Sequence, residues 1–324
     1  MQRIPTLIRH SLTLLAFAAT AASAQNYPVK PIEWVVPYPA GGGSDVVARS
    51  LTEAMGQALG QPIIINNKPG AATNIGADYV AHAKPDGYTI LTGDTATLAA
   101  NPALYAKLSY SAEKDLAPIG LLARFPMILV VNPAIPVKNL AEFMAWAKTQ
   151  KSGVSYATPG AGSPHHLATE LFRGTTGLNL VHVPYRGAAP AVQDVAGGQL
   201  PFMFVDTASG MGFINAGRLR AIGIASPQRV KNFETIPTLN EQGLKGFEAY
   251  AWQGLAAPAG TPADVIAKLN KTLVDALNST PVKARFQVLG LEPTPSTPAQ
   301  MGSYAKAERE KWAQVIRTSG IKLD

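Results

Sequence analysis

Apolar residues follow two alternating spacings along most of this chain, and the alternation predicts strands that are separated by helices. Residues 32–36 form a short run of β-branched and aromatic side chains that is typical of a buried strand. Apolar residues then recur every four positions over 47–59, which predicts an amphipathic helix, and Gly60 is a natural end for it. The same succession returns down the chain, so we expect an α/β fold with mostly parallel sheets.

The remaining elements are predicted from the same spacings and from the clusters of Gly, Pro, Asn and Asp between them. Further strands are expected at 62–65, 88–91, 119–123, 127–131, 154–157, 180–183, 200–205, 219–224 and 252–256. Further helices are expected at 73–81, 140–148, 165–176, 188–195, 263–277, 282–289 and 298–318. This number of strand–helix units exceeds one typical domain.

We therefore expect two α/β lobes that face each other across a cleft, each with a mostly parallel sheet flanked by helices. The chain is predicted to cross between them near 124–127 and 248–252. Residues 25–125 and 250–324 then form the first lobe, and residues 126–249 form the second. In parallel sheets, ligands bind beyond the carboxyl ends of the strands, where 38–43 and 92–97 both fall.

Two strand-to-helix turns are rich in glycine. Residues 37–45 read PYPAGGGSD, and residues 158–164 read TPGAGSP immediately before the helix predicted at 165. Free backbone N–H groups and the helix dipole make such a helix N-terminus suitable for a small anion. Glycine-rich turns also occur where the chain merely reverses, but the second copy favours anion binding. No Gly-Lys-Ser/Thr follows either turn, so neither is a phosphate-binding loop.

The first residues have the three parts of an export signal. Arg3 and Arg9 give a basic start, 12–19 an apolar core, and Ala22-Ser23-Ala24 a small-residue cleavage pattern. We expect residues 1–24 to be a signal peptide that is cleaved after Ala24. The later apolar runs are too short to span a bilayer, which indicates a soluble periplasmic protein.

Composition and charge narrow the function further. The chain of 324 residues has no cysteine, so no disulfides are expected. The formal net charge is +7, but the basic residues are scattered and not interleaved with aromatic residues. This pattern argues against nucleic-acid binding.

Short motifs along the mature chain together resemble those of a known family. In order, they are Tyr27-Pro-Val-Lys-Pro-Ile, Val36-Pro-Tyr-Pro-Ala-Gly-Gly, Asn67-Lys-Pro-Gly-Ala, Pro85-Asp-Gly-Tyr-Thr, His166-Leu-Ala-Thr-Glu-Leu-Phe, His182-Val-Pro-Tyr-Arg-Gly, Arg218-Leu-Arg-Ala and Pro258-Ala-Gly-Thr-Pro. Together they resemble the extracytoplasmic receptors of tripartite tricarboxylate transporters, often called the Bug family. The resemblance covers essentially the whole mature chain.

The resemblance implies a two-lobed periplasmic-binding-protein fold, type II-like, that closes over a small organic acid or amino acid. It implies a monomer without cofactor, metal or catalytic residues, which delivers its ligand to membrane transporter subunits. In the family, a ligand carboxylate is held largely by backbone groups, small hydroxyls and water. Carried over to this sequence, the ligand-binding residues are Tyr38, Ala40, Gly41, Gly42, Thr92, Asp94, Thr95, Thr158, Gly162, Ser163, His166 and Asp206.

Asp94 departs from the family pattern, because small residues are more usual near that position. An acid there would repel a second carboxylate on the ligand, but it could bind an amine or a hydroxyl. Asp206 also has a second interpretation, since an Asp at the end of a strand often caps a helix.

Other functions remain open at this point. A periplasmic serine hydrolase could use Ser163 and His166, although no orienting acid is evident and no serine lies in a G-x-S-x-G motif. His166 and Glu170 are spaced to share a metal, but no third ligand is apparent. Arg186 is either an ion clamp in the cleft or an ordinary surface residue. A binding protein that signals to a sensor kinase has the same sequence features as a transport receptor.

Overall fold

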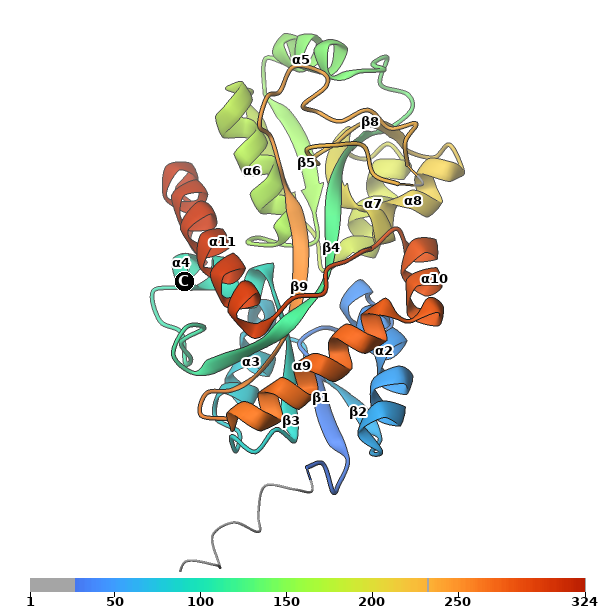
Figure 1. Cartoon of the computed structure of the whole chain (residues 1–324). Coiled ribbons are helices and arrows are strands. Elements are labelled where there is room, and N and C mark those ends of the chain that lie inside the picture. Colours follow the sequence, from blue (N-terminus) through green and yellow to red (C-terminus); the bar gives the residue numbers. More distant parts are fainter. Residues whose placement is uncertain (1–26, 232, 324) are drawn as a thin grey trace, which may run out of the picture.

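Two α/β lobes lie one above the other and share a pair of long strands (Figure 1). The structure, a computed structural model, describes residues 27–231 and 233–323. The expected signal peptide lies outside these residues. Within them, no helix combines the length and the apolar character needed to cross a membrane.

The sheet of the first lobe is mixed. β1 pairs in parallel with β2 and with β3, and β9 then pairs antiparallel with both β3 and β4. The strands, in spatial order, are β2 (Ile63–Asn67), β1 (Ile32–Val36), β3 (Thr89–Asp94), β9 (Tyr250–Pro258), β4 (Leu116–Val131) and β10 (Glu292–Pro293).

The second lobe repeats this plan around the other half of β4. There β5 pairs in parallel with β6 and β7, and β4 pairs antiparallel with β7 and β8. The strands, in spatial order, are β6 (Leu180–Pro184), β5 (Val154–Thr158), β7 (Phe202–Asp206), β4 and β8 (Arg220–Ile224).

β4 corrects one prediction, because the strands expected at 119–123 and 127–131 are a single strand of 16 residues. Arg124, Phe125 and Pro126 do not break it, since they remain paired with β9. From Met127 onward the strand pairs with β7 and β8 of the second lobe. The other crossing strand, β9, follows Ala249, which still bonds to residues of the second lobe. The division into 25–125 with 250–324, and 126–249, stays a prediction.

The faces of the first sheet are covered by different helices because strand side chains alternate. Trp34 packs on one face with α2 (Gly43–Leu59), α9 (Ala263–Asn278) and α10 (Thr280–Leu289). Its neighbour Val35 packs on the other face with α3 (Asn74–Ala81) and α11 (Pro298–Ser319).

The second sheet is sandwiched in the same way. α5 (Leu140–Thr149) and α6 (Pro164–Thr176) cover one face, where Phe143, Phe172 and Phe202 share a core. α7 (Ala188–Ala196) and α8 (Thr207–Asn215) cover the other face. The sequence pattern did not predict α8.

Candidate ligand-binding site

Registers along the shared strands make the carboxyl ends of β3 and β7 face each other. Asp94 ends β3 and pairs with Gln253, which pairs with Ala123 of β4. Asp206 ends β7 and pairs with Met127, four residues farther along β4. The two strands run in opposite directions relative to β4, so their ends approach from opposite lobes. Along the axis of β4, the two ends are offset by four residues, which is about 13 Å.

The two glycine-rich turns lie at these same edges. β1 is parallel to β3, and β5 is parallel to β7, so 37–42 and 158–163 leave the sheets on the facing sides. Topology therefore brings the predicted residues of the first lobe to one side of the gap and those of the second lobe to the other.

The turn after β1 ends in an uncapped helix N-terminus. α2 starts at Gly43, and its N-cap residue Gly42 makes no side-chain hydrogen bond to the helix. The first intrahelical bond is donated by the N–H of Val46, so the N–H groups of Gly43 and Ser44 have no partner within the helix. The predicted residues Ala40, Gly41 and Gly42 are exposed.

Asp45 holds this turn in place through hydrogen bonds to its carboxylate. Its carboxylate accepts the N–H of Gly41 at 2.8 Å, the guanidinium of Arg49 at 2.8 Å and the amide of Asn67 at 3.0 Å. Gly41 has a φ of 80°, a conformation that strains any residue with a side chain. Burial alone would raise the pKa of Asp45, but these hydrogen bonds outweigh it and lower the pKa. The turn is thus fixed by an ionised internal acid.

Gln253 is a site residue that the sequence reasoning missed. Its side chain is 6% exposed, and its Nε2 donates to Ser44 Oγ, 2.7 Å away, in the first turn of α2. Its Oε1 is buried and has no hydrogen-bond partner among the described residues. One signal pointed to it, since it is a single polar residue inside the apolar run 252–257. A buried acceptor therefore lies beside the helix N-terminus.

Asp94 is directed toward the protein, not toward the opposite lobe. Its carboxylate accepts hydrogen bonds from the hydroxyl of Tyr38, from the N–H of Thr97 at 2.9 Å and from the hydroxyl of Thr97 at 2.7 Å. It is 4% exposed, and burial raises its pKa although these bonds act in the opposite direction. Two predicted ligand residues, Tyr38 and Asp94, thus bind each other.

Thr92 and Thr95 are completely buried beside Asp94. The hydroxyl of Thr92 accepts the indole N–H of Trp34 at 2.8 Å. The hydroxyl of Thr95 accepts the backbone N–H of Trp252 at 3.0 Å. Both hydroxyls therefore join strands and neighbouring core elements, and their contact with a ligand stays a prediction.

In the second lobe, the predicted residues form one connected turn before α6. Ser163 is the N-cap and accepts the N–H of His166. The N–H of Gly162 donates to His166 Nδ1 at 3.0 Å. Thr158 Oγ1 lies 2.6 Å from Nε2 of His182. The turn is thus fixed by the ring of His166 in the way that Asp45 fixes its counterpart.

The imidazole of His166 is neutral in this arrangement. It lies parallel to the ring of His182, with the centroids 3.8 Å apart. Burial, followed by the charge of His182, lowers the pKa of His166 to about 4. Because Nδ1 accepts a hydrogen bond, the proton of the neutral ring lies on Nε2. The side chain therefore supplies one N–H donor.

Asp206 caps α8 and also pairs with a histidine. It accepts the N–H of Ser209 at 2.9 Å, and its other oxygen lies 3.0 Å from His165 Nε2. Burial would raise its pKa, but these contacts outweigh burial and lower it. Asp206 and Asp94 thus both act as helix caps at the facing strand ends.

Neither catalytic nor metal chemistry gains support from this geometry. Within residues 27–231 and 233–323, no hydrogen bond joins the hydroxyl of Ser163 to the ring of His166, as a serine nucleophile would need. Glu170 accepts the hydroxyl of Tyr156 and pairs with Arg173. No cluster of three or more metal-ligating side chains occurs in that part of the chain.

Comparison with known proteins decides the family. Residues 47–321 match the family described as "Tripartite tricarboxylate transporter family receptor". The chain belongs to this family. It is 36% identical to Protein BugT of Bordetella pertussis over 94% of each chain. The receptor family and the two-lobed fold expected from the sequence are therefore confirmed.

Solved structures of similar proteins agree with the fold of this receptor. "R. palustris Rpa4515 with adipate" is 31% identical, with a TM-score of 0.85 over 91% of this chain and 99% of that one. MatC (Rpa3494) from Rhodopseudomonas palustris, with bound malate, is 34% identical, with a TM-score of 0.81 over 90% and 100%. The individual ligand contacts predicted for this chain stay predictions.

Proposed function

We propose that this receptor captures a small carboxylate-containing metabolite in the periplasm and delivers it to a tripartite tricarboxylate-type transporter. Family membership supports the receptor role, and two similar structures hold the dicarboxylates adipate and malate. The observation that carries the proposal in this chain is the uncapped N-terminus of α2 at the edge that faces the second lobe.

In this proposal, the backbone N–H groups of Gly43 and Ser44 bind one ligand carboxylate. The helix dipole adds to the attraction, and no desolvated cationic side chain is needed. Ala40 to Gly42 form the wall of this subsite. The turn of the second lobe, from Thr158 to Ser163 with the Nε2–H of His166, contacts the ligand from the other side.

The rest of the ligand meets the facing strand ends, where Asp94 and Asp206 are committed to capping. The buried Oε1 of Gln253 needs a hydrogen-bond donor. A hydroxyl or amino group next to the carboxylate would satisfy it. This favours a hydroxy acid or an amino acid over an unsubstituted dicarboxylate.

Delivery requires that the lobes open and close around the ligand. β4 and the segment before β9 are the connections at which pairing changes from one lobe to the other, so they are the hinge in this proposal. We propose a monomer that is exported with cleavage after Ala24, has no enzymatic activity, and contacts the membrane subunits transiently.

Calorimetry with a panel of organic acids tests the proposal. Malate, succinate, adipate, citrate, aspartate and glutamate are titrated into the mature protein, and melting temperatures are measured in parallel. At least one acid should bind and raise the melting temperature through linkage. If all six give neither heat nor a shift, the proposed ligand class is wrong.

A further inference from the structure

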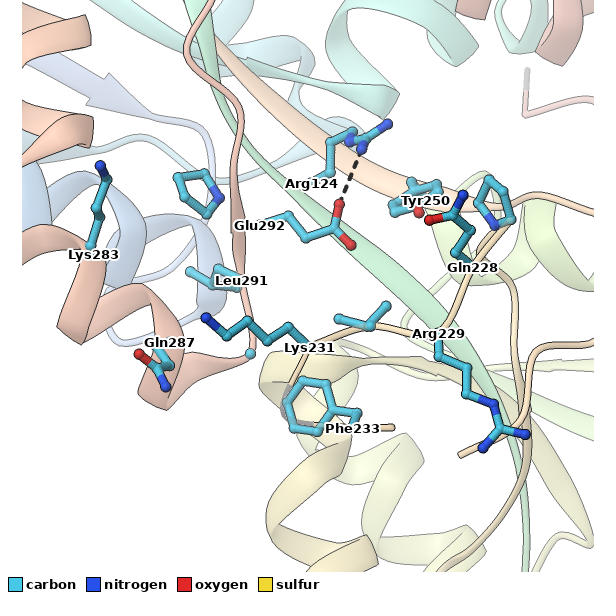
Figure 2. Close-up of a pocket in the computed structure, with 14 residues that line it drawn as sticks. Arg124, Gln228, Arg229, Lys231, Phe233, Tyr250, Lys283, Gln287, Leu291 and Glu292 are labelled. Atoms are coloured by element: carbon cyan, nitrogen blue, oxygen red, sulfur yellow. Dashed lines mark hydrogen bonds and ion pairs between the residues drawn. The ribbon is translucent and has the colours of Figure 1, made fainter. Parts of the chain in front are cut away.

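A second cavity lies beside the hinge strand β4, where the two lobes meet. One edge of β4 pairs with β9 and then with β8, and its other edge pairs with β10 and then with β7. The cavity has a volume of about 580 Å³, and residues of β10 and residues that follow β8 are among those that line it (Figure 2). None of the twelve predicted ligand residues lines it.

Both lobes contribute to this hinge pocket. α10 and the segment 290–293 line it from the first lobe, and residues 227–231 and Phe233, which follow β8, line it from the second. Arg124 and Tyr250 lie between them on β4 and β9, as Figure 2 shows. Its volume falls within the range of small-molecule sites, about 300–1,000 Å³. An occupant would therefore touch the hinge and both lobes at once.

The charges that line the hinge pocket are not balanced. Arg124 pairs with Glu292 at 3.1 Å, and Arg229 makes two 3.0 Å hydrogen bonds to the carboxylate of Glu241, so these charges are neutralised. Lys231 and Lys283 line the same pocket, and neither has an ion-pair partner among the described residues. Two uncompensated ammonium groups remain.

The two lysines belong to different lobes. Lys231 comes from the segment after β8, and Figure 2 shows its side chain extending across the pocket toward α10. Lys283 lies on α10 itself. The buried Nε of Arg124, which also lines the pocket, has no hydrogen-bond partner among the described residues. An N–H donor and two cations thus line one cavity.

We propose that the hinge pocket binds a small divalent anion, which bridges the lobes by contacting Lys231 and Lys283. Two uncompensated positive charges match an anion of charge −2, and the guanidinium of Arg124 supplies a further hydrogen-bond donor. Inorganic phosphate and dicarboxylates share this chemistry. The inference does not depend on the ligand of the candidate site, because no residue is common to the two.

Calorimetry of the mature protein in a phosphate-free buffer tests this site. Phosphate is titrated in one arm and succinate in the other, both with Gly42→Asp present to weaken binding at α2. The test variant is Lys231→Gln with Lys283→Gln. The control is Lys148→Gln with Lys151→Gln, which removes two exposed lysines from the far end of the second lobe.

We expect one or both anions to bind, and the affinity to fall roughly tenfold in the test variant but not in the control. Each lost contact is an exposed ion pair worth up to about a fivefold change in affinity. Binding should also weaken with added sodium chloride. A response to phosphate alone or to succinate alone identifies the source of the anion. Absence of binding by both, or equal losses in test and control variants, overturns the proposal.

Discussion

The substitution Gly42→Asp places a carboxylate where the ligand's carboxylate is proposed to bind. Gly42 is exposed and has ordinary extended backbone angles, with φ −75° and ψ 167°. A Cβ built there meets only the carbonyl oxygen of Pro39, at 3.4 Å. The new side chain therefore fits, and as an N-cap it accepts the free N–H groups of α2. The folded protein should be as stable as the wild type or slightly more stable.

The cost to ligand binding is much larger. Two carboxylates about 5 Å apart, at an effective dielectric constant of about 20, repel by about 3 kcal/mol. This corresponds to a loss in affinity of roughly a hundredfold. The repulsion adds to the loss of the N–H donors, which the new side chain now occupies.

Three variants separate these effects in calorimetry with the tightest-binding acid of the panel. Gly42→Ala tests space alone and should bind nearly as the wild type does. Gly42→Asn adds the cap without charge and should lose less affinity than Gly42→Asp. If Gly42→Asp binds as tightly as Gly42→Asn while its melting temperature is unchanged, the α2 N-terminus is not the carboxylate subsite.

Three further predictions concern residues around the site. Gln253→Met should lower the affinity for malate, which carries a hydroxyl, by about tenfold and the affinity for succinate much less. The reason is that the lost acceptor serves a donor on the ligand. Equal losses of affinity in calorimetry would contradict this role. Tyr38→Phe should lower the free energy of unfolding by about 1–2 kcal/mol, since the buried carboxylate of Asp94 loses a donor. Tyr79→Phe, which removes an exposed hydrogen bond to Glu33, is its control in urea unfolding and should change little. The pKa of His166 is lowered to about 4 in the folded protein, whereas the ordinary value is about 6.5. The neutral ring therefore contributes fully to stability above pH 6.5. This contribution is lost as the pH falls toward 4, because the unfolded chain takes up the proton first. In urea unfolding, the free energy of unfolding should fall less between pH 7 and pH 5 in His166→Asn than in the wild type. An equal fall would argue against the buried neutral ring.

Local patterns predicted most of the elements because each depends on its own spacing of apolar residues. The helix after Gly42 and the strand before it are examples, and both occur as expected. β4 was divided in the prediction into the runs 119–123 and 127–131, with a crossing between the lobes expected at 124–127. In the structure, Pro126 lies where the pairing with β9 of the first lobe ends and the pairing with β7 and β8 of the second begins, a position that local sequence does not reveal.

The direction of the polar side chains was harder to predict than their position. Asp94 lies at the carboxyl end of β3, as expected, but its carboxylate bonds to Tyr38 and Thr97 within its own lobe. Gln253 was missed because it comes from β9, more than 200 residues after Ser44. Such contacts depend on strand order in the sheet, which spacing along one segment does not specify.

A crystal structure of the mature protein with its tightest-binding acid tests the central claim most directly. We predict a ligand carboxylate within hydrogen-bond distance of the N–H groups of Gly43 and Ser44, with 158–163 closed over it from the second lobe. A ligand bound away from the α2 N-terminus, or one held by a single lobe in a closed structure, would contradict the account.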